Sequence, residues 1–364
     1  MKESELNSTE NVIKVDRPEP ITSEIEVVQY KRRMDPQIAI EALLDGYYVL
    51  IDDYFSSGIT ILSELKKYLK NNKSDKSYKE QHDTRSEFRD LSHKLLLEVR
   101  NNKLVVKKAP EIGWFKILYS DLNEFLLPFP QVQGLNSSWQ WYEKGISIPV
   151  LHRKIHPWFG TYFPTRFEHL ELFDNWLKEY RGEKKSAIDI GIGSGILSFQ
   201  MLKHGFEKVC GTDSNSNAIV GLREDLKLNN LQSRIELFHG DLFANCVEKS
   251  ELIVFNPPWI PAFHNIDGID KAIYYEPNLF PRFFSEAKKH LSENGRIVLL
   301  FSNLAQVTKT GEINPIEVEL AKGNKFKKEL LIQKKVASAS KNTRRDQSWR
   351  SYEMVELWVL KQDI

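Results

Sequence analysis

The spacing of hydrophobic and polar residues changes near residue 130. Before that point, apolar residues recur at every third or fourth position in PQIAIEALLDG, GITILSELKKYLKN and TRSEFRDLSHKLLLEVR, which predicts amphipathic helices. The short segment KLVVKKAP predicts a strand. We therefore expect a mainly helical N-terminal domain over residues 21–130, preceded by a polar, flexible tail over residues 1–20.

A segment rich in aromatic and β-branched residues follows. Its sequence, SSWQWYEKGISIPVLHRKIHPWFGTYFPT, is interrupted by glycine and proline. This composition predicts short strands or a hairpin that lead into a loop. Residues 131–167 are therefore expected to form a hairpin that connects two domains.

Strand and helix patterns alternate over the rest of the chain. The predicted strands are AIDIGIG, KVCGTD, RIELFHGD, ELIVFNPP and RIVLLFSN, and the predicted helices between them are ILSFQMLKHG, SNAIVGLREDLKLNN and FPRFFSEAKKHLSENG. Such a series predicts an α/β fold, in which helices cover both faces of a mainly parallel sheet. Two final strands, KELLIQKKVAS and SYEMVELWVLK, have little helix between them and are expected to pair antiparallel at one edge.

Composition narrows the class of protein. The chain has 364 residues, of which 41% are hydrophobic, and its 20 Phe and 8 Trp can fill a sizeable core. Its two cysteines exclude a disulfide scaffold and a cysteine-cluster metal site. His152, His156 and His169 do not form a metal-binding motif, so we expect no metal. No apolar run approaches the roughly 20 residues of a membrane span, and no signal peptide is visible, which predicts a cytoplasmic protein.

Charge is distributed unevenly although the net charge is only +1. Residues 61–110 hold 13 Lys/Arg against 7 Asp/Glu, and residues 322–350 hold 10 against 2. Such segments are typical of a surface that meets an anionic partner such as RNA or DNA, and equally of solvated faces.

A glycine-rich segment lies between the first strand and helix of the alternating region. It reads Asp189-x-Gly191-x-Gly193-x-Gly195. Glycines at this position allow a ligand to approach the backbone, and the helix N-terminus favours polar or anionic groups. The spacing differs from the G-x-G-x-x-G of nicotinamide-dependent dehydrogenases.

Polar residues also end the next two strands. Asp213 can accept hydrogen bonds from both hydroxyls of a ribose, or it can cap the following helix, which Ser214 or Asn215 could do instead. Asp241 can accept a hydrogen bond from an adenine amino group while Leu242 or Phe243 packs on the ring, or it can be an ordinary turn residue.

The sharpest signal is Asn256-Pro257-Pro258-Trp259, at the end of the fourth strand. The prolines stiffen the loop and remove two N–H donors. The Asn256 side-chain oxygen and the Pro257 carbonyl can then accept hydrogen bonds from a planar amino group. Trp259 offers a face for stacking, or it can be part of the core.

Together these motifs resemble the class I S-adenosylmethionine (SAM)-dependent methyltransferases, and within them the methyltransferase-small group with an NPP-aromatic motif. The resemblance covers about residues 155–362 and implies a Rossmann-like seven-stranded sheet with an antiparallel edge strand over residues 168–364. It implies SAM as cofactor and S-adenosylhomocysteine as product. It also implies which residues hold each part of the ligands. The methionyl part of SAM is held by Asp189 with Gly191, Gly193 and Gly195, the ribose by Asp213 with Ser214, and the adenine by Asp241 with Leu242. The acceptor nitrogen is held by Asn256 with Pro257, Pro258 and Trp259.

The segment GTYFPTRFEHLEL precedes this region and resembles the PRPET motif of the glutamine N5-methyltransferases. Phenylalanine replaces the second proline, which brings it closer to a bacterial group that reads YGVFSP-x-R-x-EY. The resemblance implies a loop for the acceptor or for access of SAM, made of Phe163, Pro164, Thr165, Arg166 and Glu168.

The sequence therefore predicts an N-methyltransferase that acts on a planar nitrogen. The exocyclic amine of a nucleobase is narrowly favoured by the basic segments and by Trp259. A protein glutamine is favoured by the PRPET-like segment, and a small metabolite by the lack of a recognisable RNA-binding module. The alternatives are a SAM-binding scaffold without activity and, less favoured, a nicotinamide-dependent oxidoreductase.

Overall fold

The computed structural model describes residues 13–72, 78–262, 272–323, 326–337 and 352–363. The chain forms two compact units: an N-terminal unit, Asp16–Glu143, and a C-terminal unit, Lys144–Ile364 together with Met1–Val15. Most of the predicted flexible tail, residues 1–12, lies outside the described residues. Within the described ranges, no helix combines the length and apolarity that crossing a membrane requires.

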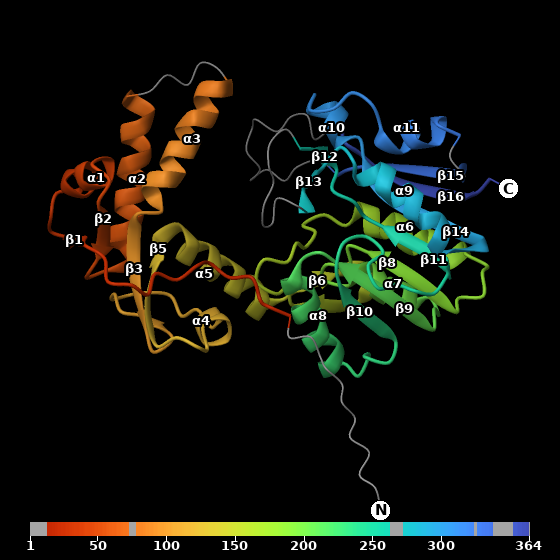
Figure 1. Cartoon of the computed structure of the whole chain (residues 1–364), viewed down its shortest axis with the longest axis horizontal. Helices are drawn as coiled ribbons and strands as arrows, with labels where there is room; N and C mark the ends of the chain where they lie inside the picture. Colours follow the sequence, from red (N-terminus) through yellow and green to blue (C-terminus); the bar gives the residue numbers. More distant parts are fainter. Residues whose placement is uncertain (1–12, 73–77, 263–271, 324–325, 338–351, 364) are drawn as a thin grey trace, which may run out of the picture. The chain divides into compact units, whose positions relative to one another are not determined.

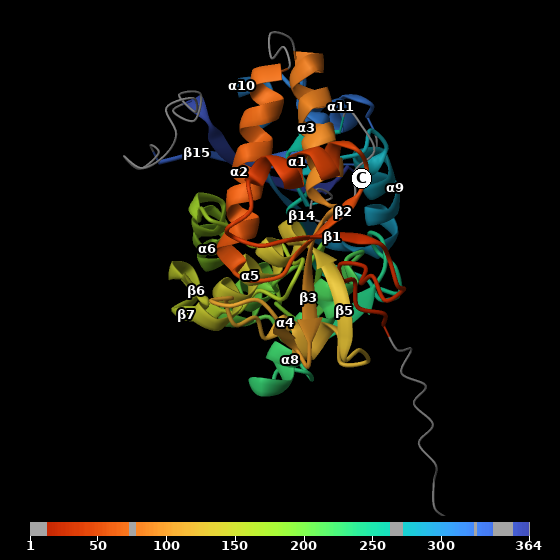
Figure 2. The ribbon, with the colours of Figure 1, turned by 90° about the vertical axis from the view of Figure 1, so that its left-hand side faces the viewer.

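The N-terminal unit is mainly helical as predicted, but it also contains a five-stranded sheet, of which the sequence indicated only the strand at KLVVKKAP. The five strands are β1 (Val27–Tyr30), β2 (Tyr48–Ile51), β3 (Leu95–Arg100), β4 (Lys103–Leu104) and β5 (Glu124–Pro128). The first three run parallel, and β3 pairs antiparallel with β4 and β5. The helices are α1 (Pro36–Leu44), α2 (Phe55–Asn72), α3 (Tyr78–Ser92), α4 (Trp114–Leu118) and α5 (Phe129–Lys144), with α2 and α3 side by side (Figure 2).

Strand β3 shows why this sheet was missed. The helix predicted over residues 84–100 ends at Ser92, and Leu95, Leu96, Leu97 and Val99 are fully buried in β3. A strand that is buried on both faces is a continuous apolar run, which lacks the alternation that distinguishes a strand from a buried helix.

The boundary between the units also differs from the predicted one. The segment predicted as strands from residue 137 begins as the end of α5, where the Trp139 and Tyr142 rings pack on Trp114. The hairpin itself is present, and consists of β6 (Ile146–Ile148), the 3-10 turn η1 (Pro149–Leu151) and β7 (Arg153–Ile155). Trp139 and Tyr142, which suggested a strand, are therefore helical residues that pack on Trp114, whereas Trp141 of the same helix is exposed.

The C-terminal unit confirms the predicted α/β fold (Figure 1). Its seven-stranded sheet has the order β10-β9-β8-β11-β14-β16-β15. The sheet strands are β8 (Ser186–Ile190), β9 (Lys208–Asp213), β10 (Ile235–His239), β11 (Ser250–Phe255), β14 (Leu291–Ser302), β15 (Phe326–Lys335) and β16 (Met354–Gln362). The other elements are α6 (Glu168–Glu179), α7 (Ile196–Lys203), α8 (Ser216–Leu228), β12 (Ile260–Pro261), β13 (Tyr274–Tyr275), α9 (Leu279–His290), α10 (Leu304–Val307) and α11 (Pro315–Ala321).

The antiparallel strand is not itself at the edge. β16 pairs antiparallel with β14 on one side and with β15 on the other, so β15 is the edge strand. The two last strands pair antiparallel as predicted, and the final one is inserted between β14 and the edge strand β15.

Two hydrophobic clusters fill the faces of this sheet. Leu252 and Val254 of β11 point into a cluster with α6, α7 and α8, while Ile253 and Phe255 point into a cluster with α9 and α11. Successive side chains of a strand alternate between faces, so these apolar runs require helices on both sides. The carboxyl ends of β8, β9, β10, β11 and β14 therefore meet at one edge of the sheet.

Candidate active site

The glycine-rich segment forms the turn between β8 and α7. Gly191, Gly193 and Gly195 all have positive φ, between 52° and 75°, a region that glycine enters without the penalty other residues meet. A Cβ added to Gly193 would meet no heavy atom nearer than 3.9 Å. The nearest atoms, the Gly191 and Tyr162 carbonyl oxygens, are thus at ordinary contact distance and do not crowd the Gly193 backbone.

Asp213 ends β9 beside this turn. Its carboxylate accepts hydrogen bonds from the backbone N–H groups of Gly193 and Asn215, each at 2.8 Å. Burial raises the pKa of Asp213, and these two bonds oppose the rise. Asn215 caps α8 by accepting from Asn217 N–H, whereas Ser214 is exposed. Asp213 is therefore not needed as the helix cap, and its remaining lone pairs suit ribose hydroxyls.

Asp189 lies beneath the glycine turn and is 1% exposed. One carboxyl oxygen accepts from the Ser198 hydroxyl at 2.6 Å, and the other is buried without a hydrogen-bond partner among the described residues. Burial raises the pKa of Asp189 to about 7. An orphaned buried oxygen beside an uncrowded glycine turn fits a polar, cationic ligand such as the methionyl part of SAM.

The loop after β10 adjoins Asp213, because His239 pairs with Asp213 and Gly240 N–H bonds to the Asp213 carbonyl at 2.9 Å. The Asp241 side chain is exposed and forms an ion pair with Arg282 of α9. Leu242 is buried, and its carbonyl accepts from the Thr212 hydroxyl. The loop is thus adjacent to Asp213, and the adenine contact of Asp241 stays a prediction, as does the ribose contact of Asp213.

A disulfide joins Cys210 of β9 to Cys246, at the end of this same loop. The two cysteines are 36 residues apart in sequence. The low cysteine count excludes a disulfide scaffold but gave no indication of this single bond. It fastens the loop that carries Asp241 and Leu242 to the strand that ends at Asp213.

Asn256 follows β11 directly. Phe255 pairs with Ile190, so Asn256 and Gly191 are adjacent at the ends of neighbouring parallel strands. The Trp259 indole N–H donates to the Asn256 side-chain oxygen at 3.2 Å and to the Leu300 carbonyl at 3.3 Å. Pro257 is buried, while Pro258 and Trp259 are half-buried. The NPPW segment is therefore brought next to the glycine turn.

Trp259 is partly a core residue, which is one of the two roles that the sequence suggested, and its stacking role stays a prediction. Its ring packs against both hydrophobic clusters of the sheet, so it is partly core. The ring of His169, in the first turn of α6, meets it at 90° with centroids 5.6 Å apart. In the sequence, His169 was weighed only as a possible metal ligand. No sequence pattern indicated its contact with Trp259.

The predicted access loop is tied to the last two sheet strands. Arg166 forms an ion pair at 2.8 Å with the buried Glu353, which precedes β16. The Glu168 carboxylate accepts a hydrogen bond at 2.9 Å from the backbone N–H of Ala337, which follows β15. Pro164 is buried, Phe163 is half-buried and Thr165 is exposed. The loop is thus held in place rather than isolated.

Two backbone carbonyls just before this loop also contact the site residues, and the sequence did not predict them. The Ser194 hydroxyl donates to the Tyr162 carbonyl at 3.0 Å, and the Asn215 side chain donates to the Gly160 carbonyl at 2.9 Å. These bonds place residues 160–162 beside the glycine turn and the Asp213 segment. Contacts to the backbone between residues 32 and 55 positions apart cannot be recognised in a single sequence.

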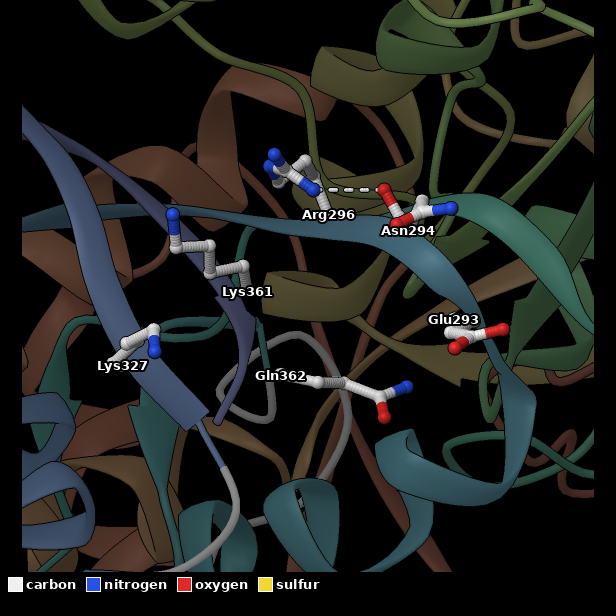
Figure 3. Close-up of a pocket in the computed structure, with 6 residues that line it drawn as sticks. All are labelled: Glu293, Asn294, Arg296, Lys327, Lys361 and Gln362. Carbon is white, nitrogen blue, oxygen red and sulfur yellow. Dashed lines mark hydrogen bonds between the residues drawn. The ribbon is translucent and has the colours of Figure 1, made fainter. Parts of the chain in front are cut away.

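A separate cavity of about 290 Å³ lies at the opposite edge of the sheet (Figure 3). It is lined by Glu293, Asn294, Arg296, Lys327, Lys361 and Gln362. Arg296 and Lys361 pair with Glu329, and Lys327 pairs with Asp363. Because Arg296 pairs with Leu252 near the start of β11, this cavity is far along the strands from Asn256. It is not the site that the motifs form.

Metal ligands are not assembled in the part of the chain that the structure describes: no group of three His, Cys, Asp or Glu side chains there could hold an ion. His169 is buried against Trp259, and His156 lies next to Gly145.

Comparisons with known proteins agree with these motifs. The family model "Methyltransferase small domain" matches residues 171–327. The relative named "Putative protein N5-glutamine methyltransferase" from Methanocaldococcus jannaschii is 32% identical over 166 residues, which are 44% of this chain and 80% of that protein. A release factor glutamine methyltransferase from Lactococcus lactis is 26% identical over 37% of this chain and 53% of that protein. A ribosomal RNA small subunit methyltransferase C from Alcanivorax borkumensis is 36% identical over 21% of this chain and 23% of that protein.

Proposed function

Because the chain belongs to the methyltransferase small family of SAM-dependent enzymes, we propose that it methylates a planar nitrogen held by Asn256 and Pro257. The observation that carries the proposal is the adjacency of Asn256 and Gly191 on neighbouring parallel strands. It brings a group that accepts N–H hydrogen bonds next to the turn that suits the methyl donor.

The residues that would hold SAM are those around the glycine turn. The Gly193 backbone is uncrowded, Asp213 suits the ribose hydroxyls, and the buried oxygen of Asp189 suits the cationic methionyl part. Bound SAM supplies an electrophilic methyl group on a cationic sulfonium, and S-adenosylhomocysteine is the product. Most of the catalysis then comes from positioning the acceptor in line with that methyl group.

The acceptor nitrogen is a weak nucleophile because its lone pair is delocalised. The Asn256 side-chain oxygen and the Pro257 carbonyl accept hydrogen bonds from its N–H groups, which orients the lone pair and stabilises the positive charge that develops on nitrogen. Neutral asparagine is not a base, so the proton leaves the methylated nitrogen to water or to a carbonyl.

A protein glutamine is the first candidate acceptor. The side-chain amide is planar and carries two N–H groups, which match two neighbouring acceptor oxygens. Two relatives, of which this chain spans 80% and 53%, are named as glutamine methyltransferases. The PRPET-like segment includes Gly160 and Tyr162, whose carbonyls accept hydrogen bonds from Asn215 and Ser194.

A nucleobase amine is the second candidate. Exposed basic side chains lie on α2 and α3 of the N-terminal unit, namely Lys66, Lys70, Arg85 and Arg89. The second basic segment, residues 322–350, gives less support. Lys322, Lys327 and Lys334 pair with Glu319, Asp363 and Glu171, and residues 338–350 lie outside the described residues.

The experiment is methyl transfer from SAM labelled in its methyl group to a cell extract. A protein glutamine is supported if protease releases the label and nuclease does not, and if the rate of methyl transfer changes little with salt. Label that nuclease releases, with binding that weakens steeply as salt rises, supports the nucleobase. Label in the small-molecule fraction points to a metabolite. SAM binding without any transfer supports a SAM-binding scaffold and contradicts the proposal.

A further inference from the structure

His169 is a buried polar residue that contacts the NPPW segment from α6. It is 5% exposed, in the first turn of α6, and its Nδ1 atom is buried without a hydrogen-bond partner among the described residues. Its ring meets the Trp259 ring edge-on, at 90° and 5.6 Å between centroids. With Nδ1 unbonded, the contact through which this ring can reach the site is its packing on Trp259.

Trp259 connects this histidine to the site. The indole N–H is shared between the Asn256 side-chain oxygen at 3.2 Å and the Leu300 carbonyl at 3.3 Å. When one N–H donor is shared between two acceptors at such distances, both contacts are sensitive to the direction of the N–H. Either contact weakens when the donor turns away from that acceptor. The orientation of the indole ring therefore sets the orientation of the Asn256 amide.

We propose that His169 is a positioning residue for the acceptor site: its ring, set edge-on to Trp259, fixes the indole whose N–H holds the Asn256 carbonyl oxygen. This inference rests on the proposed function, in which Asn256 holds the acceptor nitrogen. Perpendicular packing is one of the arrangements that aromatic pairs prefer.

His169 is itself held by a rigid element. The start of α6 is fastened to the last two sheet strands by Arg166–Glu353, by Glu168 with Ala337 N–H, and by Glu171–Lys334. Helix α6 also packs on β14, β15 and β16. A residue that positions a site needs such support, because small displacements of a reacting group slow the reaction.

The imidazole is suited to this place because it is neutral. Burial lowers the pKa of His169 to about 4, so the ring carries no charge at neutral pH. A cation there would oppose the positive charge that develops on the acceptor nitrogen. The ring therefore offers a flat edge without an electrostatic cost.

The test compares His169→Ala with His169→Phe, which keeps a flat ring and has no ring nitrogen. We expect His169→Ala to lower kcat about tenfold or more with the acceptor fraction of the extract, since a misplacement of about 1 Å can cost 100-fold. SAM affinity stays within about twofold in both variants, because the glycine turn is unchanged. His169→Phe regains most of the lost kcat.

A spectroscopic readout is independent of turnover. The Nε1–H resonance of Trp259, identified by its loss in Trp259→Phe, should shift or broaden in His169→Ala and return toward its position in His169→Phe. The control is His204→Ala: His204 bonds to Asp174 of α6 at 2.7 Å, so its loss perturbs the same helix away from Trp259. It should lower the Tm and leave both the resonance and kcat unchanged.

Asn256→Ala, measured in parallel, separates two kinds of failure. If Asn256→Ala is inactive while His169→Ala keeps the wild-type kcat and resonance, the positioning role is wrong and the proposed function stands. If His169→Phe is as slow as His169→Ala, the flat ring is not what positions the indole, and the inference is likewise overturned. If Asn256→Ala keeps full activity, the proposed function itself fails.

Discussion

The side-chain oxygen of Asn256 accepts a hydrogen bond at 3.2 Å from the indole N–H of Trp259, three residues further along the chain. An indole nitrogen can only donate, so this contact fixes which end of the amide is the oxygen. One lone pair of that oxygen is occupied, and the second remains for an N–H of the acceptor. The NPPW segment thus orients its own hydrogen-bond acceptor before any substrate arrives.

Replacing Asn256 by alanine should separate transfer from cofactor binding. We expect Asn256→Ala to lower kcat by about 100-fold or more, as loss of one charge-stabilising contact does elsewhere, with SAM affinity changed by less than about twofold. Single-turnover transfer and calorimetry of SAM binding measure the two effects. Trp259→Phe, which loses the indole N–H and one of the two fused rings, should give a smaller loss. Wild-type turnover in Asn256→Ala would contradict the assignment.

Replacing Asp213 should weaken SAM binding rather than slow methyl transfer. Asp213→Ala removes a carboxylate that the backbone N–H groups of Gly193 and Asn215 already hold in place, so we expect SAM to bind about tenfold or more weakly. Transfer at saturating SAM should fall much less. The matched control is Asp225→Ala on α8, whose carboxylate pairs with Arg153 at 2.9 Å. Equal SAM affinity in wild type and Asp213→Ala would rule out the ribose role.

Asp189 makes stability depend on pH in a defined direction. Its pKa is about 7 in the folded chain, above its ordinary value, so the folded state holds the proton more tightly than the unfolded state does. The resulting stabilisation is complete below about pH 4 and is lost as the pH rises through 7. Between pH 5 and pH 8, the wild-type protein should lose on the order of 2 kcal/mol relative to Asp189→Asn. Urea unfolding of both proteins at the two pH values measures this, and parallel pH profiles would refute it.

The Cys210–Cys246 disulfide closes a loop of 36 residues. Chain-entropy arguments for a loop of that length give a stabilisation of about 3–4 kcal/mol. We therefore expect a lower free energy of unfolding in Cys246→Ser, and the same value for the wild-type protein in reductant as for the variant. A wild-type protein whose stability is the same with and without reductant would argue against the bond.

The C-terminal unit could be predicted closely because its strands are apolar runs bounded by glycine, aspartate or proline. KVCGTD coincides with β9, and the predicted helix from Ser216 matches the start of α8. The short strands of the N-terminal unit could not be separated from helices, since runs such as Leu95–Val99 have no periodicity of their own.

The acceptor site was predictable only in part. Asn256 and Gly191 are signalled by their own motifs, and the parallel sheet places them side by side. His169 with Trp259 and Cys210 with Cys246 are pairs brought together by packing alone, 90 and 36 residues apart. A single sequence holds no record of which distant residues touch.

The measurement that tests the central claim most directly uses SAM with a ¹³C-labelled methyl group and the acceptor fraction of the extract. The carbon chemical shift of the product distinguishes a methyl group on nitrogen from one on oxygen, sulfur or carbon. We predict an N-methyl signal on an amide or aromatic amine, present with the wild-type protein and absent with Asn256→Ala. An O-methyl, S-methyl or C-methyl signal, or an N-methyl signal of equal strength with Asn256→Ala, would contradict the account.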